Sequence, residues 1–296
     1  MSTSPWWARP RFIVTAVADL QTVKTYRYLR IAMIALVVGL GVSVAYEAAH
    51  VAGDCLKSSI SAYYYSPVRG FFVSSLVAIG VCLVCLQGNS PLEDALLNLA
   101  GMLAPVVALV PTPYEANNCP SIARDDHSSS ADVANNMTAL LALGAIALII
   151  TVLLAVAQRE DRQIWFGIGG ALALWGFTVA VFESDRGYFE GHAHYTAAIA
   201  MFVAIIAVVG VNALHLGQRK LALGHSAGRS AYANRYAVIA VAMLLSVGVV
   251  LTWKWTAGFA HWVLAIEAAL ITLFATFWVA QTMELWSRGL RSTPDT

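Results

Sequence analysis

Glu267 has the greatest potential for chemistry in this sequence, because it is the only charged residue in a long apolar run. That run extends from Ala260 to Met283. A carboxyl group among apolar helical residues is costly unless it is protonated, paired with a donor or turned toward a wet cavity. It can act as an acid or base, as a counter-ion, or as a link between helices. We therefore take Glu267 as the candidate catalytic or ligand-binding residue and predict that it faces the inside of a helix bundle. By depth, we expect at least one of five groups to lie within hydrogen-bonding reach of it, directly or through one water: His50, Arg69, Ser74, His194 and Tyr195.

Histidine and carboxylate side chains gather where the predicted helices reach one face of a membrane, and such pairs can transfer protons or bind zinc. They are His50, His192, His194, His261, Glu47, Glu183, Asp185 and Glu190. An extended backbone at His192–His194 would turn both rings to one side. The spacing matches no zinc motif of the H-E-x-x-H kind, so neither a metal nor another cofactor is predicted. His50, His194 and His261 remain candidate ligand-binding residues.

The segment Ser58–Gly70, SSISAYYYSPVRG, precedes a predicted helix and is the least random stretch of the chain. Its three adjacent tyrosines suit the headgroup level of a bilayer, where amphipathic rings collect. Arg69 near the end of the segment can meet a phosphate or a carboxylate. Tyr64 and Arg69 are therefore candidate ligand contacts. The alternative is that they only anchor the chain at the membrane boundary.

The four cysteines fall into two pairs. Cys55 and Cys119 lie in two different predicted outer loops, where an oxidising compartment permits a disulfide, and they form the candidate bridge. Cys82 and Cys85 have the C-x-x-C spacing of redox motifs. They lie about 18 Å along a predicted helix from its outer end, which is too deep to reach the loop cysteines. We interpret them as small packing residues.

The composition indicates which elements must position these groups. Of the 296 residues, 59% are apolar and only 12% are charged, and the mean hydropathy is +0.68, which excludes an ordinary soluble domain. A net charge of +1 provides no basic field for nucleic acid. About 20 helical residues cross a bilayer core. Eight apolar windows near that length predict an all-α, polytopic transmembrane bundle, although the third window is short and contains Pro105. The windows are Tyr28–Tyr46, Gly70–Gln87, Ala95–Pro111, Met137–Ala157, Ile164–Phe182, His194–His215, Tyr236–Trp253 and Ala260–Met283.

The distribution of lysine and arginine predicts the orientation of the bundle. Thirteen fall on the side that holds both chain ends and five on the other side, which favours N-in and C-in. The outer loops would then be Glu47–Arg69, Thr112–Asn136, Glu183–Ala193 and Lys254–Phe259. We expect residues 1–27 to be a cytoplasmic segment, with the first 25 lying along the membrane surface. Residues 28–286 would form one transmembrane domain and 287–296 a cytoplasmic tail.

Several of these segments together resemble a known family. They are the run Ser59–Arg69 (SISAYYYSPVR), the helix Glu93–Gly101, His194-Tyr195 with the helix after it, and the closing run Glu267–Trp286. This set is similar to a family of uncharacterised bacterial, especially actinobacterial, multi-pass integral membrane proteins. The resemblance implies a helical membrane fold and carries no established activity. Simpler members of that family have six helices, so the extra pair here would lie near residues 137–182.

The function predicted first is that of a non-enzymatic protein of the cytoplasmic membrane. It would bind or move a lipid or small amphiphile, or accompany a larger membrane assembly. Its partners would be membrane lipids and a small amphiphilic ligand. One alternative is an intramembrane enzyme that acts on a lipid headgroup through Glu267, and another is a proton-coupled transporter. Lipid bound between the outer halves of the first, second and last helices would favour binding or chemistry.

Overall fold

The computed structural model describes residues 11–50, 56–114, 130–159, 162–224 and 228–286. Within these ranges all of the regular secondary structure is helical, with no strand. Two short 3₁₀ helices, η2 (Ser61–Tyr65) and η5 (Gly228–Tyr232), accompany eight α-helices. The α-helices are α1 (Arg11–His50), α2 (Arg69–Cys85), α3 (Pro91–Leu109), α4 (Ser130–Gln158), α5 (Arg162–Ser184), α6 (Arg186–Ala222), α7 (Arg235–Ala257) and α8 (Trp262–Glu284).

The helices are those of a multi-pass membrane protein. Seven of those described are long and apolar enough to cross a membrane, and α2 is an apolar helix of only 17 residues. The order of the eight predicted apolar helices is confirmed. The third was expected to be the weakest, yet α3 meets the length for a span and α2, about 25 Å long, is the short one.

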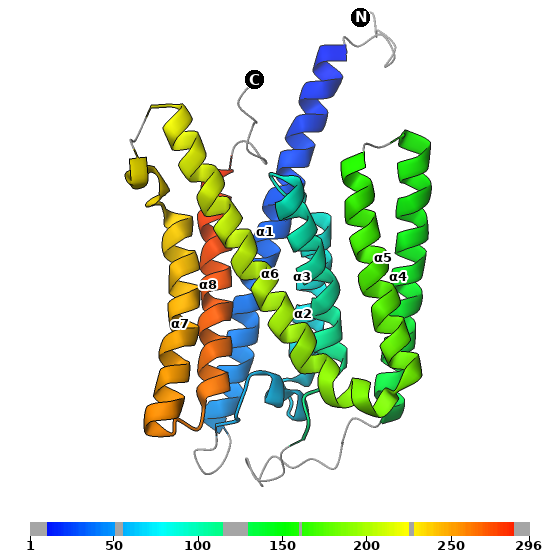
Figure 1. Cartoon of the computed structure of the whole chain (residues 1–296), viewed down its shortest axis with the longest axis vertical. Helices are drawn as coiled ribbons and strands as arrows, with labels where there is room; N and C mark the ends of the chain where they lie inside the picture. The colour runs from blue at the N-terminus through cyan, green and yellow to red at the C-terminus, as the bar shows by residue number, and fades with distance from the viewer. Residues whose placement is uncertain (1–10, 51–55, 115–129, 160–161, 225–227, 287–296) are drawn as a thin grey trace, which may run out of the picture.

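Successive α-helices run in alternating directions, so the start of α1 and the end of α8 lie at the same end of the bundle (Figure 1). The opposite end, which we call the η2 end, holds η2, the end of α1 and the start of α8. Basic residues at the η2 end are Lys57, Arg69, Arg186 and Lys254. Those at the other end include Lys24, Arg27, Arg159, Arg162, Arg219, Lys220 and Arg235. The alternation thus separates the described basic residues as the sequence predicted.

The main body consists of α1, α2, α3, α6, α7 and α8, which pack as neighbours in a ring. The α4–α5 hairpin lies on one side of it (Figure 1). Inside the hairpin, the indole Nε1–H of Trp175 donates to the carbonyl of Leu141 at 2.9 Å. Most side chains of both helices are exposed, as expected for apolar helices surrounded by lipid. The hairpin spans Ser130–Ser184 and so includes residues 137–182.

The contact between α2 and α3 is a close approach of two backbones. A Cβ atom built on Gly80 would lie 2.7 Å from the carbonyl oxygen of Gly101, and one on Gly101 would lie 2.7 Å from the oxygen of Gly80. Pro105, inside α3, has no N–H to bond the Gly101 carbonyl four residues earlier. That freed oxygen faces the Gly80 backbone, where a Cα–H group can approach it. The two glycines therefore set the spacing of the two helices.

Two segments that the sequence analysis placed outside the membrane spans are helical in the structure. Residues 11–25 extend α1 as one continuous helix, and their place along the membrane surface stays a prediction. The predicted outer loop Glu183–Ala193 is wrong, because α6 begins at Arg186. Its start is fixed by Asp185, whose side chain accepts a hydrogen bond from the Tyr188 amide at 2.9 Å. His192 and His194 are consequently helical and point to different sides of α6: His192 is exposed and His194 is buried.

Candidate functional site

Glu267 lies in the second turn of α8 and turns into the bundle, as predicted. Its Oε2 accepts hydrogen bonds from the backbone amides of Ile60 at 2.5 Å and Ser61 at 3.4 Å. Its Oε1 accepts one from the Ser61 hydroxyl at 3.0 Å. The donors thus belong to the tyrosine-rich segment, but they are not the groups predicted by depth. None of the five groups predicted by depth bonds the carboxylate directly, and a contact through one water stays a prediction.

Helix α8 and the residues at the start of η2 provide hydrogen-bond partners for each other's unpaired backbone groups. The first amides of a helix have no partner within it, and η2 has no side-chain cap of its own. The carboxylate of Glu267 fills that role from another helix. In return, the amide of Leu264 in the first turn of α8 donates to the Ser58 carbonyl at 3.0 Å. This two-way arrangement fixes η2 across the start of α8.

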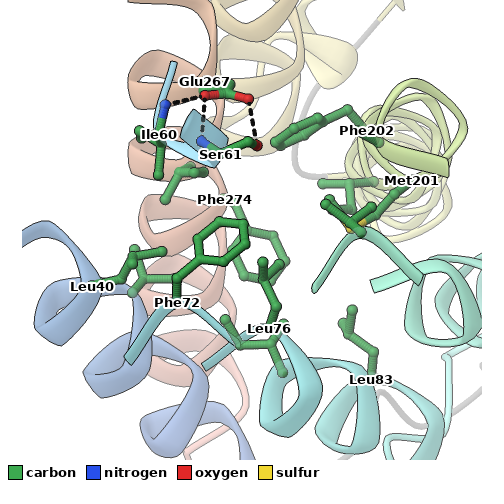
Figure 2. Close-up of a pocket in the computed structure, with 16 residues that line it drawn as sticks. Leu40, Ile60, Ser61, Phe72, Leu76, Leu83, Met201, Phe202, Glu267 and Phe274 are labelled. Atoms are coloured by element: carbon green, nitrogen blue, oxygen red, sulfur yellow. Dashed lines mark hydrogen bonds between the residues drawn. The ribbon is translucent and has the colours of Figure 1, made fainter. Parts of the chain in front are cut away.

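An apolar cavity lies directly beside this contact (Figure 2). About 60 Å³ of it is accessible to the centre of a water molecule, which is more than one water needs and describes a narrow space. Its walls come from α1, α2, α3, α6 and α8, and η2 closes one end. Phe72 and Leu76 of α2, Phe202 of α6 and Phe274 of α8 are among the lining side chains. The first, second and last helices, between which bound lipid would favour binding or chemistry, all border this cavity.

The cavity has one polar end. Of its 16 lining residues, 14 are apolar, and the two others are Glu267 and Ser61. Figure 2 shows both together at one end of the cavity, with Leu83 far from them. The arrangement can accommodate an apolar body along the walls and a small polar group at the η2 end. Few polar groups at fixed positions in an apolar pocket are typical of sites that orient a ligand.

Tyr64 and Arg69, the predicted ligand contacts, lie close to each other but do not line the cavity. The guanidinium of Arg69 packs 4.5 Å from the centre of the Tyr64 ring. It also lies 3.9 Å from the carboxylate of Asp132 at the start of α4. Tyr64 is buried, and the neighbouring Tyr65 donates its hydroxyl to the Thr112 carbonyl at 2.8 Å. The pair packs against η2 and the start of α4, and contact of either residue with a ligand stays a prediction.

The three candidate histidines do not meet at one site. His194 is buried and its Nδ1–H donates to the carbonyl of Val110, just past the last turn of α3, at 2.7 Å. Helix carbonyls at this position lack partners within the helix, so His194 acts as a cap for α3. His50 is exposed, stacks on Tyr46 and bonds the Tyr46 carbonyl. His261 precedes the first turn of α8 and does not line the cavity.

Burial changes the pKa of two groups next to η2, outside the membrane-spanning helices. Removal from solvent lowers the pKa of Lys57, and the charge of Glu47 opposes this change in part. Burial also raises the pKa of the Tyr63 phenol. The ammonium of Lys57 lies 5.9 Å from the Tyr63 ring centre. These shifts reflect how firmly the η2 segment is packed into the bundle.

A buried polar cluster that sequence reasoning missed lies at the opposite end of the bundle. Glu93, in the first turn of α3, accepts from the side chain of Asn212 of α6 at 2.8 Å and from the Asn89 amide at 3.0 Å. Gln281 of α8 donates to Asn212 at 3.3 Å. Two signals could have revealed this cluster: the Ser90-x-x-Glu93 spacing of a capping box, and single amides within the apolar runs of α6 and α8.

The predicted Cys55–Cys119 disulfide lies outside the described residues and stays a prediction. Cys82 and Cys85 are both free thiols, with Cys82 buried in the α2 packing surface. Within the described ranges, no group of three or more histidine, cysteine or acidic side chains could hold a metal ion.

Comparisons with protein-family models, with curated proteins and with solved structures find no match to this chain. The family resemblance noted in the sequence is therefore not tested by them. The cavity, its polar end and the η2 contact are the features from which function must be argued.

Proposed function

We propose that the protein binds a small amphiphile in the cavity between α1, α2, α6 and α8, with the polar group of the ligand at Glu267 and Ser61. The observation that carries this proposal is the division of the cavity lining, with apolar walls and polar groups at one end only. An amphiphile has the same division into an apolar body and a polar tip. Its partners would be lipids or lipid-like molecules that reach the cavity from the bilayer.

The proposal includes an orientation in the cytoplasmic membrane with eight spans, N-in and C-in. It is supported by the separation of basic residues between the two ends, because positively charged segments stay on the cytoplasmic side. The short helix α2 would complete the eighth crossing at about 25 Å, within the tolerance for a locally thinned bilayer. The η2 end and the polar end of the cavity would then lie near the outer face.

Binding accounts for the site better than catalysis does. An acid or base that acts on a lipid headgroup needs a second reactive group beside it, and the only other polar lining residue is Ser61, whose hydroxyl bonds Glu267. No observation on the described residues favours a proton-coupled transporter over a binding protein. Both alternatives remain predictions from the sequence.

The test replaces a small residue in the cavity wall by a large one, which fills the space. Ala198 of α6 lines it, and Ala198→Phe would place a ring in the space that the ligand needs. Ile199→Phe is the matched control, because Ile199 on the same helix is 66% exposed and does not line the cavity. The measurement is native mass spectrometry of protein purified from membranes, with thermal unfolding to verify the fold of each variant.

We expect wild type and Ile199→Phe to carry a bound amphiphile mass that folded Ala198→Phe has lost. The proposal is wrong if Ala198→Phe retains the same mass, or if the wild-type protein neither carries nor takes up any amphiphile.

A further inference from the structure

We infer that the cavity selects amphiphiles whose head is a hydrogen-bond-donating cation, such as a long-chain primary amine. This inference rests on the proposed function and names the ligand class for the same site. It follows from which hydrogen-bonding groups remain available at the polar end and from where the nearby cations lie.

The polar end offers acceptors to a ligand. A carboxylate has about four acceptor positions, and three hydrogen bonds from η2 reach Glu267. Two of these fall on Oε2, while Oε1 receives only the Ser61 hydroxyl. The Ser61 hydroxyl donates its one hydrogen to Glu267, so its oxygen can only accept a hydrogen bond from a ligand. A ligand head therefore finds a position on Oε1 of Glu267 and a lone pair on Ser61, and both require a donor.

The cavity lining also holds one acidic group and no cation. Its other 14 residues are apolar, so nothing within the lining balances a negatively charged head. The two basic residues of the η2 segment are engaged elsewhere: Lys57 lies against Tyr63, and Arg69 lies between Tyr64 and Asp132. An anionic head would find no cation beside it in this apolar lining, whereas an ammonium would form a charge-assisted pair with the carboxylate of Glu267.

Aromatic walls beside the polar end favour the same class. Phe202 lines the cavity and is drawn next to Ser61 and Glu267 in Figure 2. An ammonium held at the carboxylate can also interact with the face of an aromatic ring. The rest of the lining is aliphatic or aromatic, which suits an unbranched or lightly branched hydrocarbon tail.

The experiment compares four probes of the same chain length: dodecylamine, dodecanol, dodecanoate and dodecane. Each is titrated against a displaceable fluorescent amphiphile bound to the purified full-length protein in nanodiscs at neutral pH. Only the displacement that Ala198→Phe abolishes counts as cavity binding, which removes partition into the bilayer from the measurement. The head-group series uses the wild-type protein, so the order of the four probes can be measured even if a variant at Glu267 does not fold.

We expect dodecylamine to bind about 10- to 100-fold more tightly than dodecanol, and dodecanoate to bind more weakly than either. In folded Glu267→Gln, dodecylamine and dodecanol should bind with about equal affinity, and dodecanol should still bind. Equal binding of amine and alcohol, tighter binding of dodecanoate, or an unchanged preference in Glu267→Gln would overturn this inference and leave the proposed function intact. If none of the four probes binds in the cavity, the proposed function itself fails.

Discussion

Glu267→Leu should release η2 from the start of α8 and destabilise the protein by about 2–6 kcal/mol. Leucine has a side chain of similar size to that of glutamate, but it is apolar and accepts no hydrogen bond. The backbone amides of Ile60 and Ser61, both buried residues, would lose their acceptor. A buried donor left without a partner costs about 1–3 kcal/mol, and two are left here. Thermal unfolding in detergent measures the loss, and amide hydrogen exchange across residues 58–66 should accelerate.

Glu267→Gln is the matched control for this prediction. Its amide oxygen can accept from the two backbone amides, and its amide nitrogen can donate to the Ser61 oxygen. We therefore expect near-normal stability and near-normal exchange at η2 in this variant. If Glu267→Leu is as stable as wild type and exchange in residues 58–66 does not change, the carboxylate does not hold η2.

Gly80→Val should disrupt the α2–α3 contact and cost about 3 kcal/mol or more. Its Cβ would lie 2.7 Å from the Gly101 carbonyl oxygen and 3.0 Å from Pro105 Cδ. One neighbour is backbone and the other a ring fixed in the helix, so neither can rotate away. The helices would have to separate, and such a loss is a large part of the stability of an ordinary domain. Folded yield and thermal unfolding are the measurements.

Gly210→Val in α6 and Gly248→Val in α7 are the controls, because a Cβ at either glycine meets nothing within 4 Å. Both should fold with stability close to wild type. A Gly80→Val protein that matches them in yield and unfolding temperature would show that α2 and α3 are not held at this close distance.

Apolar run length was enough to predict the eight helices, because each must shield its backbone from lipid over a similar distance. It failed at helix ends. Residues 186–193 contain His192 and Glu190, so the hydropathy window for this helix begins only after them. The backbone is nevertheless helical from Arg186. The capping residue Asp185 was a local signal of that start, and a reading based on caps rather than hydropathy would have found it.

The candidate site could be predicted only in part. Glu267 was identifiable because a single acid in an apolar helix needs an explanation, and the segment Ser58–Gly70 was recognised as unusual. Sequence spacing gives the depth of a residue in the membrane, but it does not show which neighbouring helix the side chain faces. The actual donors include two backbone amides, which no residue type reveals. Glu93 was missed because it lies in the first turn of α3, outside the apolar window, although the fold buries it against Asn212.

The central claim, that an amphiphile occupies the cavity, is tested most directly by photolabelling. A long-chain alcohol with a diazirine in its tail is bound to the wild-type protein, and the complex is irradiated. Peptide mass spectrometry then identifies the residues that carry the label. The neutral head makes the result independent of any preference for amines. The account predicts adducts on lining residues such as Leu76, Ile205 and Phe274, suppressed by excess unlabelled alcohol. Adducts confined to exposed residues of the α4–α5 hairpin, such as Leu153 and Phe177, and unaffected by competitor, would contradict it.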